Sequence, residues 1–237
     1  MHILFPKDLT FFQHLVLQRT TPFIRIGGSE PLKYWLDTGK KEQLTNFLLH
    51  NNLFDLYIEE LIEEISNEVN ELILLTKDAS FKNIVSIGPG CGLMELIYYS
   101  QKKFNQILLV DIEESSLHQH SFNSEGSGYA SLEKTKSFLI SNGIPEEKII
   151  LCNPKKTILP KFEFDLLMSF ISMGFHYPCN DYVDFILRNI NNEGKVILDK
   201  RIGAPDPGFC LLSESLEIEN QIKFGKRIRT ILRTKSR

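Results

Sequence analysis

The chain has 237 residues, of which 42% are hydrophobic and 24% are charged, and its formal net charge is -3. This length fits one large domain with an extension better than two full domains. The negative charge disfavours a nucleic-acid partner, because proteins adapted to polyanions usually carry a strong positive balance. The four cysteines are far apart and form no CxxC pair, so neither a zinc cluster nor a disulfide framework is predicted. No apolar segment is long enough to cross a bilayer, and we expect a cytoplasmic protein without a membrane partner.

The first 80 residues are predicted to form an α-helical N-terminal extension. Apolar residues recur there at helical spacing, most clearly between 53 and 73, and a Gly-Gly-Ser-Glu-Pro segment at 27–31 interrupts the pattern once. Aromatic side chains typically line binding clefts. We therefore expect this extension to form a lid over the ligand cleft or the surface of a homodimer, through Tyr34, Trp35, Phe47 and Tyr57.

Residues 81–237 are predicted to form the catalytic domain. Five short runs are apolar on both faces, as buried parallel strands are, at 83–87, 107–110, 148–152, 164–169 and 195–198. Helical segments are predicted between them at 94–103, 129–142 and 181–189. This alternation predicts an α/β fold, a Rossmann-like, mostly parallel open sheet with helices on both faces.

The C-terminal tail, from Gln221 to Arg237, contains basic residues and no acid. Basic and apolar residues alternate between 227 and 233, which indicates a strand near the sheet edge. Lysine and arginine side chains on such a strand face solvent and discourage pairing with other chains. A phosphate-binding role for the tail is the alternative.

A glycine-rich loop follows the first predicted strand directly. The segment SIGPGCG, residues 86–92, leads from that strand into a helix. Such a loop brings the backbone close to a ligand and presents N–H groups to it. The second predicted strand ends at Asp111, where a carboxylate can accept the hydrogens of both ribose hydroxyls. Loop, helix and acid together predict a nucleoside-binding unit.

These residues resemble the class I S-adenosylmethionine-dependent methyltransferases, whose first motif is a G-x-G-x-G loop followed by an acid at the end of the second strand. The resemblance extends from about residue 82 to residue 198 and implies methyl transfer with S-adenosyl-L-methionine as cofactor. It assigns the ribose hydroxyls to Asp111 and the adenine to Asn153. The other cofactor contacts that it implies are at Ser86, Gly88, Pro89, Gly90, Gly92, Ser169 and Phe170.

The loop departs from the family in one position and from other nucleotide-binding motifs in several. The family usually has Asp or Glu where this chain has Ser86, which weakens the hold on the methionine amino group or moves that task elsewhere. A non-catalytic cofactor-binding protein is therefore one alternative. The dinucleotide fingerprint G-x-G-x-x-G is not met, because Gly92 comes one position early. Leu93 and Met94 stand where a Walker motif requires Lys and Ser or Thr, which disfavours NTP hydrolysis.

The segment that leaves the fourth predicted strand, residues 169–178, is expected to face the transferred methyl group, because ligands bind beyond the carboxyl ends of the strands. His176 is the predicted general base, since an imidazole with an ordinary pKa of about 6.5 is largely neutral at pH 7 and accepts a proton. Tyr177 is predicted to orient the substrate or stack on it. A purely structural role for both side chains is the alternative.

Two further chemistries are considered and disfavoured. Cys179 follows a proline, as the nucleophile of cytosine-C5 methyltransferases does, but no base-binding motif accompanies it. His118 and His120 are poorly spaced for a pair of metal ligands on a helix, and no metal site is predicted.

A looser resemblance bears on the substrate. The helical extension and the GFHYP segment, residues 174–178, are similar to bacterial proteins grouped with sugar O-methyltransferases. This favours a hydroxyl of a sugar or another small molecule as the methyl acceptor. A nucleic-acid methyltransferase that uses the basic tail is the alternative.

Overall fold

The computed structural model describes residues 2–76, 79–113, 121–124 and 130–235, which belong to two compact units. We call Met1–Ala79, Gly90–Gln101 and Tyr129–Ile144 the helical unit. Ser80–Pro89, Lys102–Gly128 and Pro145–Arg237 are the sheet unit. The chain first passes from the helical unit to the sheet unit next to the predicted boundary at residue 80, and it later returns to the helical unit twice. The division into domains 1–80 and 81–237 stays a prediction.

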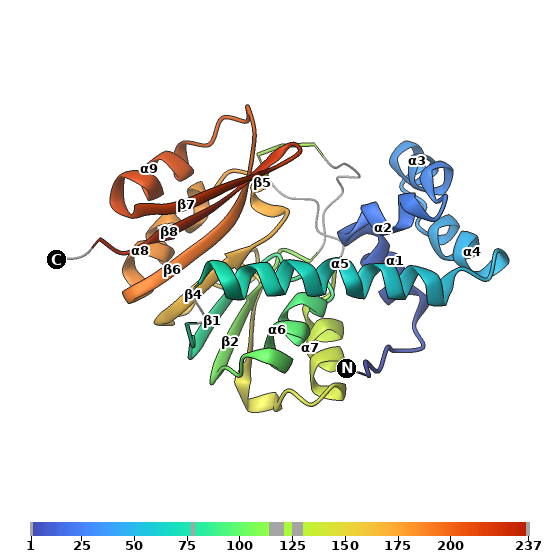
Figure 1. Cartoon of the computed structure of the whole chain (residues 1–237), viewed down its shortest axis with the longest axis horizontal. Coiled ribbons are helices and arrows are strands. Elements are labelled where there is room, and N and C mark those ends of the chain that lie inside the picture. Colours follow the sequence, from blue (N-terminus) through green and yellow to red (C-terminus); the bar gives the residue numbers. More distant parts are fainter. Residues whose placement is uncertain (1, 77–78, 114–120, 125–129, 236–237) are drawn as a thin grey trace. The chain divides into compact units, whose positions relative to one another are not determined.

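The helical unit confirms that the N-terminal region is helical. Asp8 caps the first helix by accepting the N–H of Thr10, and Gly39, in the left-handed conformation, ends the third. None of the helices in the described part of the chain is long and apolar enough to cross a membrane. The helices of this unit (Figure 1) are α1 Leu9–Gln18, α2 Thr20–Arg25, α3 Ser29–Thr38, α4 Glu42–His50, α5 Phe54–Leu75, α6 Leu93–Gln101 and α7 Leu132–Ser141.

Aromatic side chains form much of the core of the helical unit. Phe23 is fully buried and meets the rings of Phe47 and Tyr57 edge-on, at centroid distances of 5.4 and 6.0 Å. Trp35 and Tyr57 are only 1% and 0% exposed, so their side chains do not form an open surface. Their large apolar rings stabilise the unit from inside instead. Tyr34 is exposed, and the lid and dimer roles of the remaining surface stay predictions.

The sheet unit contains an open, mostly parallel sheet, as predicted. Seven strands lie in the order β3-β2-β1-β4-β6-β8-β7, and only the pairs β6–β8 and β8–β7 are antiparallel. The strands of this sheet are β1 Asn83–Ile87, β2 Gln106–Val110, β3 Ile149–Cys152, β4 Phe164–Ser169, β6 Ile190–Arg201, β7 Glu217–Phe224 and β8 Arg227–Arg233, and β5 Ser172–Tyr177 is a further strand outside this order. The helices of this unit are α8 Val183–Asn189, α9 Pro207–Ser215, and the short 3₁₀ helices η1 Glu146–Lys148 and η2 Asn180–Tyr182.

The strand order has a switch point at β1. The chain proceeds from β1 to β2 and β3 on one side, and β4 then pairs with β1 on its other side. Successive connections leave such a point in opposite directions, and ligands bind there, beyond the carboxyl ends of the strands. Val85, Leu108, Leu167 and Val196 are all completely buried in the central strands. A rigid apolar core therefore supports the edge at which β1 to β4 end.

The sequence predicted β1 and β4 with their observed ends but missed β5 and β7. No strand was predicted in the segment after β4, whereas Ile171 turns the chain in the left-handed conformation and β5 follows. Gly174, with φ of +84°, interrupts the apolar alternation in this strand. β7 is an edge strand whose residues are mostly exposed, so it lacks the apolar run that marks a buried strand.

The tail was expected to be a solvated strand near the edge, and this is partly wrong. β8 lies one strand inside the edge, between β6 and β7. Arg229 on β8 is only 1% exposed, because its guanidinium binds both carboxylate oxygens of Asp199 on β6 at 2.9 and 3.1 Å. A buried arginine requires such a partner. The sequence of β8 alone does not reveal that its partner strand supplies one.

Candidate active site

The carboxyl ends of four strands are bonded into one edge. The N–H of Gly88, which follows β1, donates to Val110 O of β2 at 2.8 Å. The N–H of Asp111, which follows β2, donates to Cys152 O of β3 at 3.2 Å. On the other side of β1, Ser169 Oγ donates to Ile87 O at 3.0 Å. The predicted residues Gly88, Asp111 and Ser169 are thus brought together.

Gly88 has a conformation and a neighbour that both require glycine. Its φ is +72°, and a Cβ at this position would overlap the hydroxyl group of Ser172 at the start of β5. Ser172 therefore lies directly against the loop, and no motif in the sequence had singled it out. Its Oγ is 3.0 Å from Tyr177 Oη, which ties the loop to the far end of β5.

Ser86 and Pro89, on either side of Gly88 in the sequence, are both buried. Ser86 is 3% exposed within β1, paired with Leu109 and Met168 of the neighbouring strands. Pro89 is buried as well. The side chain of Ser86 is therefore placed inside the sheet unit, and its predicted contact with the methionine part of a cofactor stays a prediction.

Gly90 and Gly92 belong to the helical unit, into which the chain passes after Pro89. Both have positive φ, +57° and +79°. Within this unit, Thr135 Oγ1 donates to Gly90 O at 2.5 Å. The N–H of Cys91 donates to Gln18 Oε1, at the end of α1, at 2.9 Å. Side chains of α1 and α7 therefore fix the second half of the loop.

Asp111 is half-buried at the end of β2. Its Oδ1 accepts the N–H of Glu113 at 2.8 Å. Burial raises the pKa of Asp111 to about 6, although backbone N–H donors partly oppose this and the nearby Glu113 carboxylate adds to it. The loss of solvation on burial therefore costs the ionised carboxylate more than its backbone hydrogen bonds return. Hydroxyl groups that donate further hydrogen bonds to it would stabilise its charged form.

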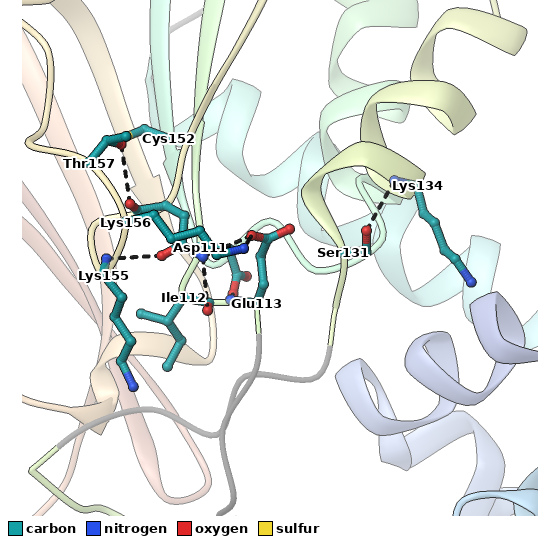
Figure 2. Close-up of polar contacts among 10 residues, drawn as sticks. Asp111, Ile112, Glu113, Ser131, Lys134, Cys152, Lys155, Lys156 and Thr157 are labelled. Atoms are coloured by element: carbon teal, nitrogen blue, oxygen red, sulfur yellow. Dashed lines mark hydrogen bonds and ion pairs between the residues drawn. The ribbon is translucent and has the colours of Figure 1, made fainter.

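Asn153 ties the ends of β2 and β3 together, and Figure 2 labels its partners Ile112, Glu113 and Lys155. Its Nδ2 donates to Ile112 O at 3.1 Å and to Glu113 Oε2 at 2.8 Å, and its Oδ1 accepts the N–H of Lys155 at 2.9 Å. Lys156 Nζ also binds Glu113 Oε2, at 3.1 Å. The side chain thus shapes the strand ends around Asp111, and a contact with adenine would replace one of these bonds. Glu113, in the left-handed conformation, gave no signal in the sequence.

A cavity of about 310 Å³ opens beside Asp111 within the sheet unit. Ile112, Pro154, Tyr177 and Tyr182 are among its lining residues. Burial raises the pKa of Tyr177 well above its ordinary value, so its hydroxyl stays protonated. The lining also includes the polar residues Ser124, Lys155, Thr157 and Asp181. Apolar and aromatic walls with a few polar groups suit a flat ring such as a nucleobase. Tyr177 and Ile112 therefore line the same cavity.

His176 has different surroundings from Tyr177, as expected for neighbours on a strand, whose side chains alternate between faces. It is half-buried, and its backbone carbonyl accepts the N–H of Asn123 at 2.8 Å. Its Nδ1 lies 3.4 Å from Ser121 O. A carbonyl oxygen only accepts, so this contact requires the proton on Nδ1 and leaves the lone pair on Nε2.

Phe170 and Ile171 form the turn between β4 and β5. The guanidinium of Arg229 covers the Phe170 ring, with Cζ 4.2 Å from the ring centroid. Ile171 has φ of +52°, which is strained for a β-branched residue. A buried cation and a strained turn therefore hold the first residues after β4 in place.

The disfavoured chemistries find no support among the described residues. The thiol of Cys179 is fully buried, with its Sγ 3.3 Å from Asp206 Oδ2, and burial together with this carboxylate raises its pKa. A thiol held in this way is a poor nucleophile. Within the described ranges, His, Cys, Asp and Glu form no group of three or more that could hold a metal, and His118 and His120 lie outside those ranges.

Comparison with solved structures identifies the fold. Neither the protein-family models nor the sequences of curated proteins match this chain. The ribosomal protein L11 methylase of Lactobacillus delbrueckii subsp. bulgaricus matches with a TM-score of 0.51 and 18% identity, over 75% of this chain and 80% of that one. The N-methyltransferase NodS of Bradyrhizobium japonicum WM9, in complex with S-adenosyl-L-homocysteine, matches with a TM-score of 0.53 and 9% identity, over 73% and 87%. This chain has a methyltransferase fold.

A third methyltransferase shares the fold. The StiE O-MT segment matches with a TM-score of 0.51 and 13% identity, over 71% of this chain and 73% of that one. The three structures cover N-methyl, O-methyl and ribosomal-protein methylation by their names. The methyltransferase fold therefore confirms the predicted fold class. Because proteins with this fold methylate different atoms, the fold does not determine the acceptor atom.

Proposed function

We propose that the chain is an S-adenosylmethionine-dependent methyltransferase that methylates a hydroxyl group of a small molecule or sugar. The observation that carries this proposal is the half-buried carboxylate of Asp111, placed beside Gly88 at the switch point of the sheet. A ribose has two hydroxyl groups that can donate hydrogen bonds to such a carboxylate and so offset its desolvation. The fold shared with NodS, which is in complex with S-adenosyl-L-homocysteine, supports the same cofactor.

The cavity beside Asp111 supports a place for the adenine. We infer that Ile112, Tyr177 and Tyr182 contact the base, while Asn153 positions the backbone of Ile112 and Glu113. Gly88, Ser169 and Phe170 then face the methionine part, at the ends of β1 and β4. In this proposal Tyr177 moves from the substrate side to the cofactor side.

The cofactor, when bound, supplies an electrophilic methyl group. His176 acts as the base in this proposal: the proton of the acceptor hydroxyl goes to Nε2 while Nδ1 keeps its own proton toward Ser121 O. The oxygen would then bond to the methyl carbon while the bond between that carbon and the sulfonium sulfur breaks, and the resulting thioether would leave. In this proposal the turn of Phe170 and the strained Ile171 lies between the cofactor and the acceptor and helps to hold both in place.

A titration tests the cofactor. We expect S-adenosylmethionine to bind the wild type, measured by calorimetry, and to bind Asp111→Ala at least tenfold more weakly. Asp184→Ala is the matched control, because Asp184 is an exposed carboxylate of α8, and it should bind like the wild type. NAD should bind none of the three. Binding of NAD, or equal affinity of wild type and Asp111→Ala for S-adenosylmethionine, would refute the proposal.

A second measurement tests the base. With an acceptor found by screening sugars and other hydroxyl compounds, His176→Gln should lower kcat by roughly 10²- to 10⁴-fold and leave cofactor affinity unchanged.

The alternative function, methylation of a nucleic acid, requires the basic residues of the C-terminal tail to face solvent. Arg229 is buried, so one of these cations is not available to bind phosphate groups. A cytoplasmic location and a homodimer stay predictions.

A further inference from the structure

The C-terminal hairpin, formed by β7 and β8, reaches the residue that leaves β4. The strands β4, β6 and β8 are neighbours in the sheet (Figure 1). The register of β4 with β6 ends at the pair Ser169 and Leu198, after which come Phe170 and Asp199. In the register of β6 with β8, Asp199 is paired with Arg229. Phe170, Asp199 and Arg229 therefore lie in one row across the carboxyl edge of the sheet.

The guanidinium of Arg229 binds both of its neighbours in this row. Its Nε and Nη2 donate to Asp199 Oδ1 and Oδ2 at 2.9 and 3.1 Å. Its Cζ lies 4.2 Å from the centroid of the Phe170 ring and 5.4 Å from that of Phe224 on β7. The N–H bonds of a guanidinium lie in its own plane, so its face can stack on a ring while its edge binds a carboxylate. Asp199 thus fixes the plane against which the Phe170 ring rests.

The chain after Phe170 requires support from such a contact. The next residue, Ile171, has φ of +52°, which strains a β-branched residue, and a strained backbone persists only where the surrounding structure holds it. After the turn, Ser172 Oγ lies 3.0 Å from Tyr177 Oη. Before the turn, the cation–π contact with Arg229 holds the ring of Phe170. The strained residue is therefore held on both sides.

We propose that Arg229 is a positioning residue of the active site, which holds the Phe170 ring in the orientation that contacts the methionine part of the cofactor. Asp199 orients the guanidinium, and the guanidinium orients the ring. A ring that is ordered before the cofactor arrives loses less conformational freedom on binding, so Arg229 increases cofactor affinity without touching the cofactor. This inference rests on the proposed function, which places Phe170 at the cofactor.

A double-mutant cycle on cofactor affinity tests this role. Calorimetry gives the Kd for S-adenosylmethionine of the wild type, Phe170→Ala, Arg229→Met and the double variant. Each single substitution should raise the Kd at least about fivefold. In the Phe170→Ala background, Arg229→Met should raise the Kd by less than about twofold, because the ring through which Arg229 acts is absent. Equal factors in the two backgrounds, or a single substitution without effect, overturn the proposal.

Arg227→Met is the matched control. Arg227 donates to the same carboxylate, with Nη1 2.9 Å from Asp199 Oδ2, but its guanidinium lies over the Phe224 ring, with Cζ 5.5 Å from the centroid. This variant should leave the Kd within about twofold of the wild-type value. If the three charges only stabilised the fold, Arg227→Met and Arg229→Met would weaken cofactor binding alike. An equal loss in both variants therefore overturns the proposal.

Fluorine NMR reports on the ring in the free protein. With 4-fluorophenylalanine at position 170, the resonance should shift or broaden in Arg229→Met and stay unchanged in Arg227→Met. If circular dichroism shows Arg229→Met to be unfolded, Arg229→Lys takes its place, because lysine keeps the charge but has no planar face to cover the ring. Arg229→Lys should then raise the Kd at least about threefold and alter the resonance. An unchanged Kd or an unchanged resonance overturns the proposal.

The same titrations separate this inference from the proposed function. S-adenosylmethionine that binds the wild type, and is weakened by Asp111→Ala but not by Arg229→Met, would overturn the role of Arg229 and leave the function standing. S-adenosylmethionine that does not bind the wild type would refute the function, and the role of Arg229 toward the cofactor would fail with it. Loss of affinity in both variants, with the expected change in the fluorine resonance, supports both.

Discussion

Acidification is expected to weaken cofactor binding through Asp111. The pKa of this carboxyl is raised to about 6 by burial, and the form that accepts ribose hydroxyls is the ionised one. About nine-tenths of the molecules are ionised at pH 7 and about one-tenth at pH 5. The Kd for S-adenosylmethionine should therefore rise about tenfold between pH 7 and pH 5, which corresponds to about 1.3 kcal/mol.

The same carboxyl affects stability with the opposite sign. A folded-state pKa above the unfolded value means that the folded chain binds the proton more tightly. The free energy of unfolding should therefore rise, on account of Asp111, as the pH falls through 6 toward 4. Asp111→Asn should unfold with a free energy on the order of 1–3 kcal/mol higher than the wild type at pH 7, while its cofactor affinity falls.

Calorimetry at pH 5, 6, 7 and 8 and urea unfolding at the same pH values measure both effects. Asp165→Asn is the control, since burial of Asp165 is outweighed by hydrogen bonds from Asn191, Asn83 and Lys82, which lower its pKa. This variant should lose stability at pH 7 and keep the pH dependence of cofactor binding. A wild-type Kd that is constant from pH 5 to 7, or the same pH dependence in Asp111→Asn, would refute the reasoning.

Three further changes test the site and its support. Gly88→Ala should lower both stability and cofactor affinity, by urea unfolding and calorimetry, because it combines a left-handed backbone with overlap of a hydroxyl; Gly143→Ala, whose φ is +89° with open space around it, should cost only about 1–2 kcal/mol. Iodoacetamide should alkylate the exposed Cys210 and spare Cys179 in the native protein, and equal rates by mass spectrometry would contradict the burial. Arg229→Met should lower the free energy of unfolding by about 1.5–3 kcal/mol, since the buried carboxylate of Asp199 loses both hydrogen bonds from Arg229 and keeps the ion pair with Arg227; a loss under 1 kcal/mol would contradict this.

The features that sequence predicted correctly are those that a single segment determines. The apolar runs at β1 and β4 are continuous and bounded, so their ends were predicted as observed. Gly88 and Asp111 follow two strands directly, and parallel neighbours must end at the same edge. No knowledge of distant contacts is required for either prediction.

The features that sequence missed depend on residues far apart in the chain. Ser172 is selected by its contact with Gly88, and Arg229 is buried because Asp199 faces it from another strand. The strand β5 has only six residues and contains a glycine, so its periodicity is too weak to distinguish it from a loop. Charge patterns likewise predict solvent exposure only when no partner strand supplies the opposite charge.

Two unfavourable features lie at the carboxyl edge of the sheet unit. Ile171 has a left-handed backbone, and Asp111 is a carboxylate that burial makes harder to ionise. A chain selected for stability alone would remove each of them with one substitution. Hydroxyl donors of a ligand would offset the desolvation of Asp111, and the turn at Ile171 holds the chain beside the end of β4. Their common location therefore supports the proposal that this edge binds the nucleoside of a cofactor beside β2.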